Sequence, residues 1–353
     1  MFELSALGFG PFFAEQIDRE SNPIYARIAA EHRGAYEVWA ADGVAAAQLA
    51  GRLRHQAEEA PGVGDWVILK APPAPHHTAI IQSVLARRTV FLRGAAGREA
   101  KTQVVAANVD VVFAVCGLDA DFNLRRIERY LARIWASGAQ PAVILSKADL
   151  CPAAAPRMRE VERLCPGVPV FATSALADEG LGPVRAQIGP GLTAALVGSS
   201  GAGKSTLVNA LLGQELMATG AVRPTDGRGC HVTTHRQLVL LPGGGLLLDT
   251  PGMRELQLPD TDGLDETFDD VATLATRCRF RDCRHDNEPG CAVRAAVASG
   301  ELPEERLEHL RKLEREAQAY ERRNDPRLRR QSARLWGQLS DEVAHLRRLK
   351  EGD

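Results

Sequence analysis

The segment Gly198–Ser205, which reads G-S-S-G-A-G-K-S, constrains the fold more than any other stretch of this 353-residue chain. It fits the pattern G-x-x-x-x-G-K-[ST], follows an apolar run, Thr193–Val197, and leads into a helical segment, Lys204–Leu212. A strand, such a loop and a helix in this order form a phosphate-binding loop, in which backbone N–H groups and the helix N-terminus surround phosphate oxygens. The alternative interpretation is a glycine-rich turn with an incidental lysine. The flanking strand and helix favour a nucleotide site.

The residues predicted to contact the nucleotide belong to this loop and the first helical turn: Gly198, Ser199, Ser200, Gly201, Ala202, Gly203, Lys204, Ser205 and Thr206. Lys204 is expected to reach the terminal phosphates and to act in catalysis. The Ser205 hydroxyl is expected to bind Mg²⁺.

Downstream, the apolar run Leu246–Leu248 predicts a buried strand that ends in the pattern D-x-x-G, from Asp249 to Gly252. Asp249 at the end of this strand is expected to help hold magnesium. The backbone N–H of Gly252 is expected to approach a γ-phosphate, where a side chain would not fit.

The segment 230–235, which reads C-H-V-T-T-H, lies between the phosphate loop and the D-x-x-G. Thr233, Thr234 and His235 are the predicted catalytic residues of this switch segment, which would close over magnesium and the γ-phosphate. Thr234 is the predicted magnesium ligand, although the sequence alone does not separate it from Thr233. His231 and His235 are both candidates for the group that orients water, and for either of them the alternative is a solvent-exposed loop histidine.

The residues predicted to read the base lie upstream of the phosphate loop. Ser146, Lys147, Ala148 and Asp149 follow the apolar run Ala142–Leu145. A carboxylate at Asp149 can accept hydrogen bonds from both the ring N–H and the exocyclic amine of guanine, whereas adenine would leave it unpaired.

A second base-side turn, Thr173-Ser174-Ala175, follows the run Val168–Ala172. A backbone N–H at Ser174 or Ala175 is predicted to donate to the guanine carbonyl oxygen. Taken alone, S-K-A-D is equally well a helix cap after a strand. All five motifs of a GTP site are nevertheless present, with the last two of the usual order first, so the sequence predicts a circularly permuted GTPase with guanine nucleotide and Mg²⁺ as cofactors.

The segments around these motifs predict three domains. Residues 1–105 contain short β-rich runs and no long helix, which favours a small barrel, with an OB-fold as one candidate and RNA binding as its expected role. Residues 106–256 alternate apolar runs with helices, the pattern of a mostly parallel sheet covered on both faces. Residues 257–353 are helical. The predicted fold is therefore an α/β P-loop GTPase domain flanked by an all-β barrel and an α-helical domain.

Four potential metal ligands lie within fourteen residues: Cys278, Cys283, His285 and Cys291. Three thiolates and one imidazole are the donor set of a closed structural zinc site. Separate buried cysteines and a surface histidine are the alternative. We expect one structural Zn²⁺ in the C-terminal domain.

Charge and hydropathy limit the partners. The formal net charge is −2, but the stretch Arg322–Arg334 holds six arginines and one aspartate. Such a stretch is either a solvated face or a contact with a phosphate backbone. The chain has no run of about 18 apolar residues and no basic n-region at its N-terminus, so we expect a cytoplasmic protein that does not bind membranes.

With these motifs, the chain resembles the RsgA family, also called YjeQ or EngC, of circularly permuted GTPases that depend on the small ribosomal subunit. The resemblance runs from about residue 23 to residue 323. Its matching stretches are Val63–Val67 (VGDWV), Ala106–Asp110 (AANVD), Ser146–Leu150 (SKADL), the phosphate loop, Asp249–Leu256 (DTPGMREL) and Cys278–Val293. It implies an N-terminal OB-fold, a zinc-binding C-terminal domain, and a monomer that binds the small subunit and its rRNA. It also implies a role in late maturation of that subunit, which stimulates GTP hydrolysis.

Three residues differ from those usually found at the same positions in this family or in Ras-like GTPases. Ser146 replaces the usual Asn or Thr, so we expect weaker support of the base-reading loop, and Val232 replaces the first threonine of the family's H-T-T-T. Met253 follows the D-x-x-G where Ras-like GTPases carry a glutamine that orients water, which predicts slow hydrolysis without a partner. Two other functions stay open: an RNA-binding assembly factor for which hydrolysis is irrelevant, and a P-loop ATPase or small-molecule kinase.

Overall fold

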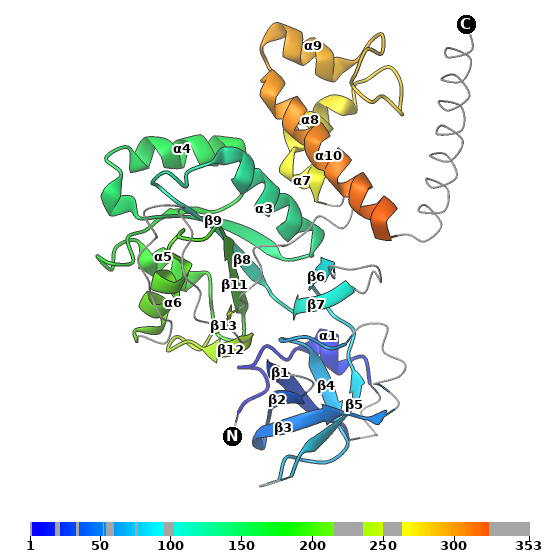
Figure 1. Ribbon diagram of the computed structural model, residues 1–353, viewed down its shortest axis with the longest axis vertical. Helices are drawn as coiled ribbons and strands as arrows, with labels where there is room; N and C mark the ends of the chain where they lie inside the picture. Colours follow the sequence, from blue (N-terminus) through cyan, green and yellow to red (C-terminus); the bar gives the residue numbers. More distant parts are fainter. Residues whose placement is uncertain are drawn as a thin grey trace, which may run out of the picture. The chain divides into compact units, whose positions relative to one another are not determined.

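The computed structural model describes residues 2–17, 22–32, 35–51, 53, 60–74, 77–94, 102–214, 236–249 and 263–324. These residues form two compact units (Figure 1). The main unit contains residues 2–94 and 102–249, and the helical unit contains residues 263–324.

The N-terminal part of the main unit is a five-stranded barrel. Its strands are β1 (Ile24–His32), β2 (Ala35–Ala40), β3 (Gly43–Leu49), β4 (Trp66–Leu69) and β5 (Ala79–Val84). The strands pair in the order β1-β2-β3-β5-β4, with β3 and β5 parallel, and a β1–β4 pairing closes the ring. This closed, OB-like barrel confirms the barrel expected from the sequence.

An N-terminal arm containing α1 (Pro11–Ala14) covers one end of the barrel. The ring of Phe9 lies 4.4 Å from that of Tyr25 and 4.9 Å from that of Trp66, measured between centroids. Phe13 and Trp66 are almost completely buried, so this aromatic cluster forms part of the core.

The remainder of the main unit is the predicted α/β domain. Its elements are β8 (Val111–Gly117), α3 (Leu124–Ala136), β9 (Gln140–Ser146), α4 (Ala154–Leu164), β10 (Val170–Ala172), α5 (Leu181–Ala186), β11 (Thr193–Gly198), α6 (Lys204–Leu212), β12 (Gln237–Leu240) and β13 (Leu246–Asp249). The strands β10-β9-β8-β11-β13 are parallel in this order, and β12 is antiparallel to β13. β12 also pairs with β1, so the barrel and the α/β sheet are continuous. A short ribbon of β6 (Val90–Gly94) and β7 (Thr102–Ala107) leads from the barrel to β8.

Side chains alternate between the two faces of this sheet, as the pleat of a strand requires. In β8, Val112 and Ala114 belong to the core on the side of α3 and α4, whereas Phe113 and Val115 belong to the core on the side of α5 and α6. Both faces are therefore buried, which explains why the central strands read as continuous apolar runs.

A buried arginine joins the arm, the barrel and the α/β domain. The guanidinium of Arg27 in β1 donates to the carbonyl oxygens of Leu7, Gly64 and Asn108. Burial lowers the pKa of Arg27 to about 10, so the side chain keeps its charge at neutral pH. Because three chain segments depend on one guanidinium, Arg27 fixes their relative positions.

We expect Arg27→Met to destabilise the main unit by about 2–6 kcal/mol, since the buried carbonyls of Leu7 and Asn108 lose their donor, at about 1–3 kcal/mol each. Urea unfolding of the full chain measures this. Arg159→Met changes an exposed arginine and is the control, with an expected effect within about 0.5 kcal/mol. Equal stability of the two variants would contradict the assigned role of Arg27.

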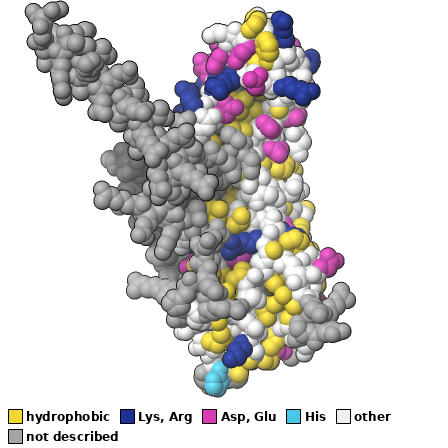
Figure 2. All heavy atoms as spheres, turned by 90° about the vertical axis from the view of Figure 1, so that its right-hand side faces the viewer, with side chains coloured by type: hydrophobic (Ala, Val, Ile, Leu, Met, Phe, Trp, Pro, Cys, Tyr) yellow, Lys and Arg dark blue, Asp and Glu magenta, His cyan; other side chains and the backbone are white. Residues whose placement is uncertain are grey.

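The helical unit contains α7 (Leu264–Thr267), α8 (Asp269–Ala275), α9 (Ala292–Ser299) and α10 (Glu304–Asn324). The buried face of α10 includes Leu307, Leu313 and Ala317. Arg306 at its start donates to Asp270 and to the carbonyl oxygen of Thr267. Basic and acidic side chains are interspersed on the face of this unit drawn in Figure 2. The side chains of the basic stretch Arg322–Arg334 lie outside the described residues.

Among the residues that the structure describes, each helix is either too short or too polar to span a bilayer.

Candidate nucleotide and metal sites

The phosphate loop connects β11 to α6, as the sequence predicts. Gly201 and Gly203 have φ angles of +80° and +86°, a conformation that glycine adopts readily and other residues rarely do. These angles bring the chain round to the N-terminus of α6, which begins at Lys204. The ammonium of Lys204 donates to the carbonyl oxygens of Gly198 (2.9 Å) and Ser199 (2.6 Å), so it lies over the loop.

The S-K-A-D segment lies at the carboxyl end of β9, one strand away from β11 across β8. The hydroxyl of Ser146 is buried and donates to the carbonyl oxygen of Ala202 in the phosphate loop, at 2.6 Å. Ser146 therefore joins the segment expected to read the base to the segment expected to hold the phosphates.

Lys147 and Asp149 follow Ser146 in the sequence and are closer to the protein surface. Lys147 has a left-handed backbone conformation, with φ +59°. A short 3₁₀ helix, η2 (Ala148–Leu150), carries Asp149, whose side chain is exposed. A carboxylate in such a position is accessible to a base.

The second base-side turn lies beside the first. The backbone N–H of Ala148 donates to the carbonyl oxygen of Thr173 (3.0 Å), and Thr173 donates to that of Leu145 (2.9 Å). Ser174 is buried and pairs with Glu179 across a tight turn, which exposes Leu176 at its tip. The strands β8, β9, β10 and β11 thus bring the phosphate loop and both base-side segments to one edge of the sheet.

Several predicted site residues fall where the structure gives no description. Thr233, Thr234, His235 and Gly252 lie outside the described residues, as does Met253. The backbone of Asp249 ends β13 beside β11, but its side chain is outside the description.

Two carboxylates that sequence reasoning missed also reach this edge. Asp119 and Asp121 lie between β8 and α3. Asp119 accepts a hydrogen bond from the Lys147 ammonium (2.6 Å), and Asp121 accepts one from the Ser199 hydroxyl (2.6 Å). Their signal in the sequence was available: two acidic residues directly after a strand whose neighbours end in the phosphate loop and in S-K-A-D.

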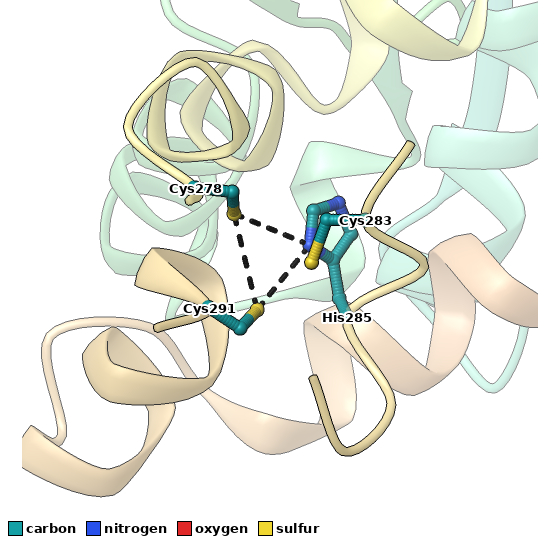
Figure 3. A group of neighbouring side chains, drawn as sticks. All are labelled: Cys278, Cys283, His285 and Cys291. Carbon is teal, nitrogen blue, oxygen red and sulfur yellow. Dashed lines mark hydrogen bonds between the residues drawn. The ribbon is translucent and has the colours of Figure 1, made fainter. Parts of the chain in front are cut away.

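The four predicted metal ligands converge in the helical unit (Figure 3). The Sγ of Cys278 lies 3.9 Å from that of Cys291, and the Nδ1 of His285 lies 3.7 Å and 3.4 Å from these two sulfurs. All four ligand atoms, including the Cys283 sulfur, lie within 4.8 Å of one another. Tetrahedral zinc with bonds of about 2.0–2.3 Å gives ligand separations of roughly 3.5–3.8 Å. The donor set and its spacing therefore fit a structural zinc ion.

The strand order, the phosphate loop and the base-side segments define a P-loop GTPase whose motifs run in a permuted order. A model of the RsgA GTPase family matches residues 84–259. The small ribosomal subunit biogenesis GTPase RsgA of Opitutus terrae is 46% identical over 350 residues, which cover 95% of each chain. The chain belongs to the RsgA family, and it is a GTPase.

Other relatives agree. The protein of the same name from Streptomyces coelicolor is 45% identical over 325 residues, or 91% of this chain and 86% of that one. The crystal structure of YjeQ from Thermotoga maritima superposes with a TM-score of 0.64 at 26% identity, covering 84% of this chain and 98% of that one. The structure of YloQ, described as a circularly permuted GTPase, shares the fold at a TM-score of 0.60 and 23% identity, covering 84% and 96%.

Proposed function

We propose that this GTPase acts in the late maturation of the small ribosomal subunit, in the cytoplasm, and that the subunit stimulates its hydrolysis of GTP. The observation that carries the proposal is that the chain matches, over 95% of its length, a relative named for biogenesis of that subunit. The contact between Ser146 and Ala202 supports the nucleotide site that the proposal needs, since it joins the base-side and phosphate-side loops.

Within this site, the residues of the phosphate loop from Gly198 to Thr206 bind the phosphates. Asp149 accepts two hydrogen bonds from guanine, and a backbone N–H of Ser174 or Ala175 donates to its carbonyl oxygen. The Lys204 ammonium leaves its two carbonyl partners and contacts the terminal phosphates, where it offsets negative charge. Ser205, Asp249 and Thr234 would hold Mg²⁺, which would neutralise more of that charge.

The catalytic step depends on a group that orients water. Met253 cannot do so, because a thioether is a poor hydrogen-bonding group. We assign this task to the segment Thr233–His235 or to the ribosomal particle. The assignment to the segment fails if Thr233→Ala, Thr234→Ala and His235→Ala all hydrolyse GTP at the unmodified rate with small subunits present.

The domains on either side of the GTPase domain bind the small ribosomal subunit. The OB-like barrel, the zinc-binding helical domain and the basic stretch Arg322–Arg334 suit contact with rRNA, by a protein that acts as a monomer. Four ligands close the coordination of the zinc ion, so its role is structural. The three domains proposed are 1–105, 106–256 and 257–353.

Co-sedimentation of the full chain with purified small subunits tests the proposed partner. We expect binding with a non-hydrolysable GTP analogue to be tighter than with GDP, because the γ-phosphate orders the switch segment. Absence of binding in every nucleotide state would contradict the proposed function. An assembly factor for which hydrolysis is irrelevant predicts the same binding but no stimulated turnover.

Ser146→Ala is expected to weaken GDP binding about five- to tenfold, because the lost hydrogen bond to the Ala202 carbonyl is worth about 1 kcal/mol or slightly more. Fluorescent GDP titration measures the effect. Ser299→Ala removes a helical serine hydroxyl in the other unit and is the matched control, with unchanged affinity expected. Equal affinities for the two variants would show that Ser146 does not support the site.

A further inference from the structure

The connection between β8 and α3, residues Leu118–Asn123, is held tightly against the base-side segment. The backbone N–H of Leu118 donates to the carbonyl oxygen of Ser146 (2.9 Å), which extends the pairing of β8 with β9. Phe122 closes a turn by donating to the carbonyl oxygen of Asp119 (3.0 Å), and the Asn123 side chain caps α3 at Arg126 (3.0 Å). We call this segment the β8–α3 loop. Since Asn123 already caps the helix, the two aspartates are not needed for that task.

Asp119 is directed to the base-side segment. Its Oδ2 accepts from the Lys147 ammonium at 2.6 Å, and its Oδ1 accepts from the backbone N–H of Asp121 at 3.0 Å. Partial burial alone would raise the pKa of Asp119, but these hydrogen bonds outweigh burial and lower its pKa below the usual value. The carboxylate is therefore ionised at neutral pH and fixes the end of the Lys147 side chain.

A glycine makes this approach possible. A Cβ placed on Gly117 would lie only 2.6 Å from the Oδ1 of Asp119. Any side chain at position 117 would push the Asp119 carboxylate away, so the end of β8 is shaped to accept it.

Asp121 is directed to the phosphate loop. Its Oδ1 accepts from the Ser199 hydroxyl at 2.6 Å, and its Oδ2 accepts from the backbone N–H of Gly117 at 3.2 Å. Arg126 of α3 forms an ion pair with the same carboxylate. A carboxylate beside a polyphosphate site would repel the ligand by its charge, and the guanidinium of Arg126 offsets that repulsion.

We propose that Asp119 and Asp121 are positioning residues for guanine nucleotide binding, Asp119 through Lys147 on the base side and Asp121 through Ser199 on the phosphate side. One short loop thereby holds both halves of the site in register. This inference rests on the nucleotide site proposed above, because Lys147 and Ser199 belong to it.

The two aspartates have separable effects. The stem of Lys147 is expected to pack along the base. Because Asp119→Ala removes a charged hydrogen bond to Lys147, it is expected to weaken GDP binding roughly tenfold. Competition by inorganic pyrophosphate, which has no base, is expected to stay unchanged. Asp121→Ala is expected to weaken GDP and pyrophosphate alike, about five- to tenfold. Asp121→Asn keeps an oxygen that accepts from Ser199 and is expected to restore most of the pyrophosphate affinity. A purely structural loop predicts no such difference between the two probes.

Double-mutant cycles on the full chain identify the side chains through which the aspartates act. In a chain that already carries Lys147→Met, Asp119→Ala is expected to reduce the free energy of GDP binding by less than about a third of the amount that it does in the unmodified chain. The same is expected for Asp121→Ala in a chain that already carries Ser199→Ala. Additive effects in both cycles would overturn the inference. If Asp121→Ala does not fold, Asp121→Asn with and without Ser199→Ala completes the cycle.

The four single variants distinguish a wrong nucleotide site from a wrong positioning role of the two aspartates. If Lys147→Met and Ser199→Ala both bind GDP at the unmodified affinity, the proposed nucleotide site itself is wrong and the inference falls with it. If these two variants bind weakly while Asp119→Ala and Asp121→Ala bind normally, only the positioning role is wrong.

Discussion

Replacing Asp149 by asparagine is expected to transfer the base preference of this GTPase from guanine to xanthine. The carboxylate accepts from the ring N–H and the exocyclic amine of guanine, whereas an asparagine amide would present a donor to that amine. Xanthine carries a carbonyl oxygen at the same position, which accepts from the amide. Two hydrogen bonds to a charged group contribute about 1.5–3 kcal/mol each, so GTP affinity should fall about 10²- to 10⁴-fold.

Competition of GTP and XTP for fluorescent GDP or XDP measures this change. Asp42→Asn makes the same substitution at an exposed site in the barrel, between β2 and β3, and should leave GTP affinity unaltered. An Asp149→Asn variant that still prefers GTP would contradict the base-reading role of S-K-A-D.

Replacing Cys291 by alanine is expected to abolish zinc binding and unfold the helical unit. The Cys291 sulfur is buried, is one of four converging ligands, and also accepts from the backbone N–H of Arg294 at the start of α9. Structural zinc contributes about 10–16 kcal/mol of apparent binding free energy to small zinc-dependent folds. We therefore expect a unit with helices as short as α7, α8 and α9 to depend on that energy.

Metal analysis and limited proteolysis of the full chain test this expectation. Zinc should fall from about one ion per chain to near zero, with cleavage appearing within 263–324. Cys165→Ala removes a buried thiol that donates to the Val161 carbonyl in the main unit and should keep its zinc. Full zinc content in Cys291→Ala would refute the four-ligand site.

Local patterns predicted the parts of the site that depend on neighbouring residues. The helix expected over Lys204–Leu212 has the same bounds in the structure, because the phosphate loop fixes its start and Gly213, with φ +69°, fixes its end. The sequence of Gly43–Leu49 does not predict the strand β3, because the segment is rich in alanine; it forms a strand through its pairing with β2 and β5.

Contacts across the sheet were less accessible from sequence. Weaker support of the base-side loop at Ser146 stays a prediction. The hydroxyl nonetheless reaches Ala202, 56 residues away, a contact that no spacing in the sequence indicates. Asp119 and Asp121 directly follow a predicted strand, so their place at this edge of the sheet was predictable. Their partners were not, because Lys147 follows β9 and Ser199 belongs to the phosphate loop. The cysteine and histidine ligands were predictable because all four lie within one short segment.

Steady-state GTP hydrolysis by the full chain, with and without purified small ribosomal subunits and with ATP as a second substrate, tests the central claim most directly. We predict slow turnover of GTP alone, a clear increase when subunits are added, and no turnover of ATP under either condition. Unchanged GTP turnover in the presence of subunits, or ATP turnover equal to that of GTP, would contradict a ribosome-activated GTPase.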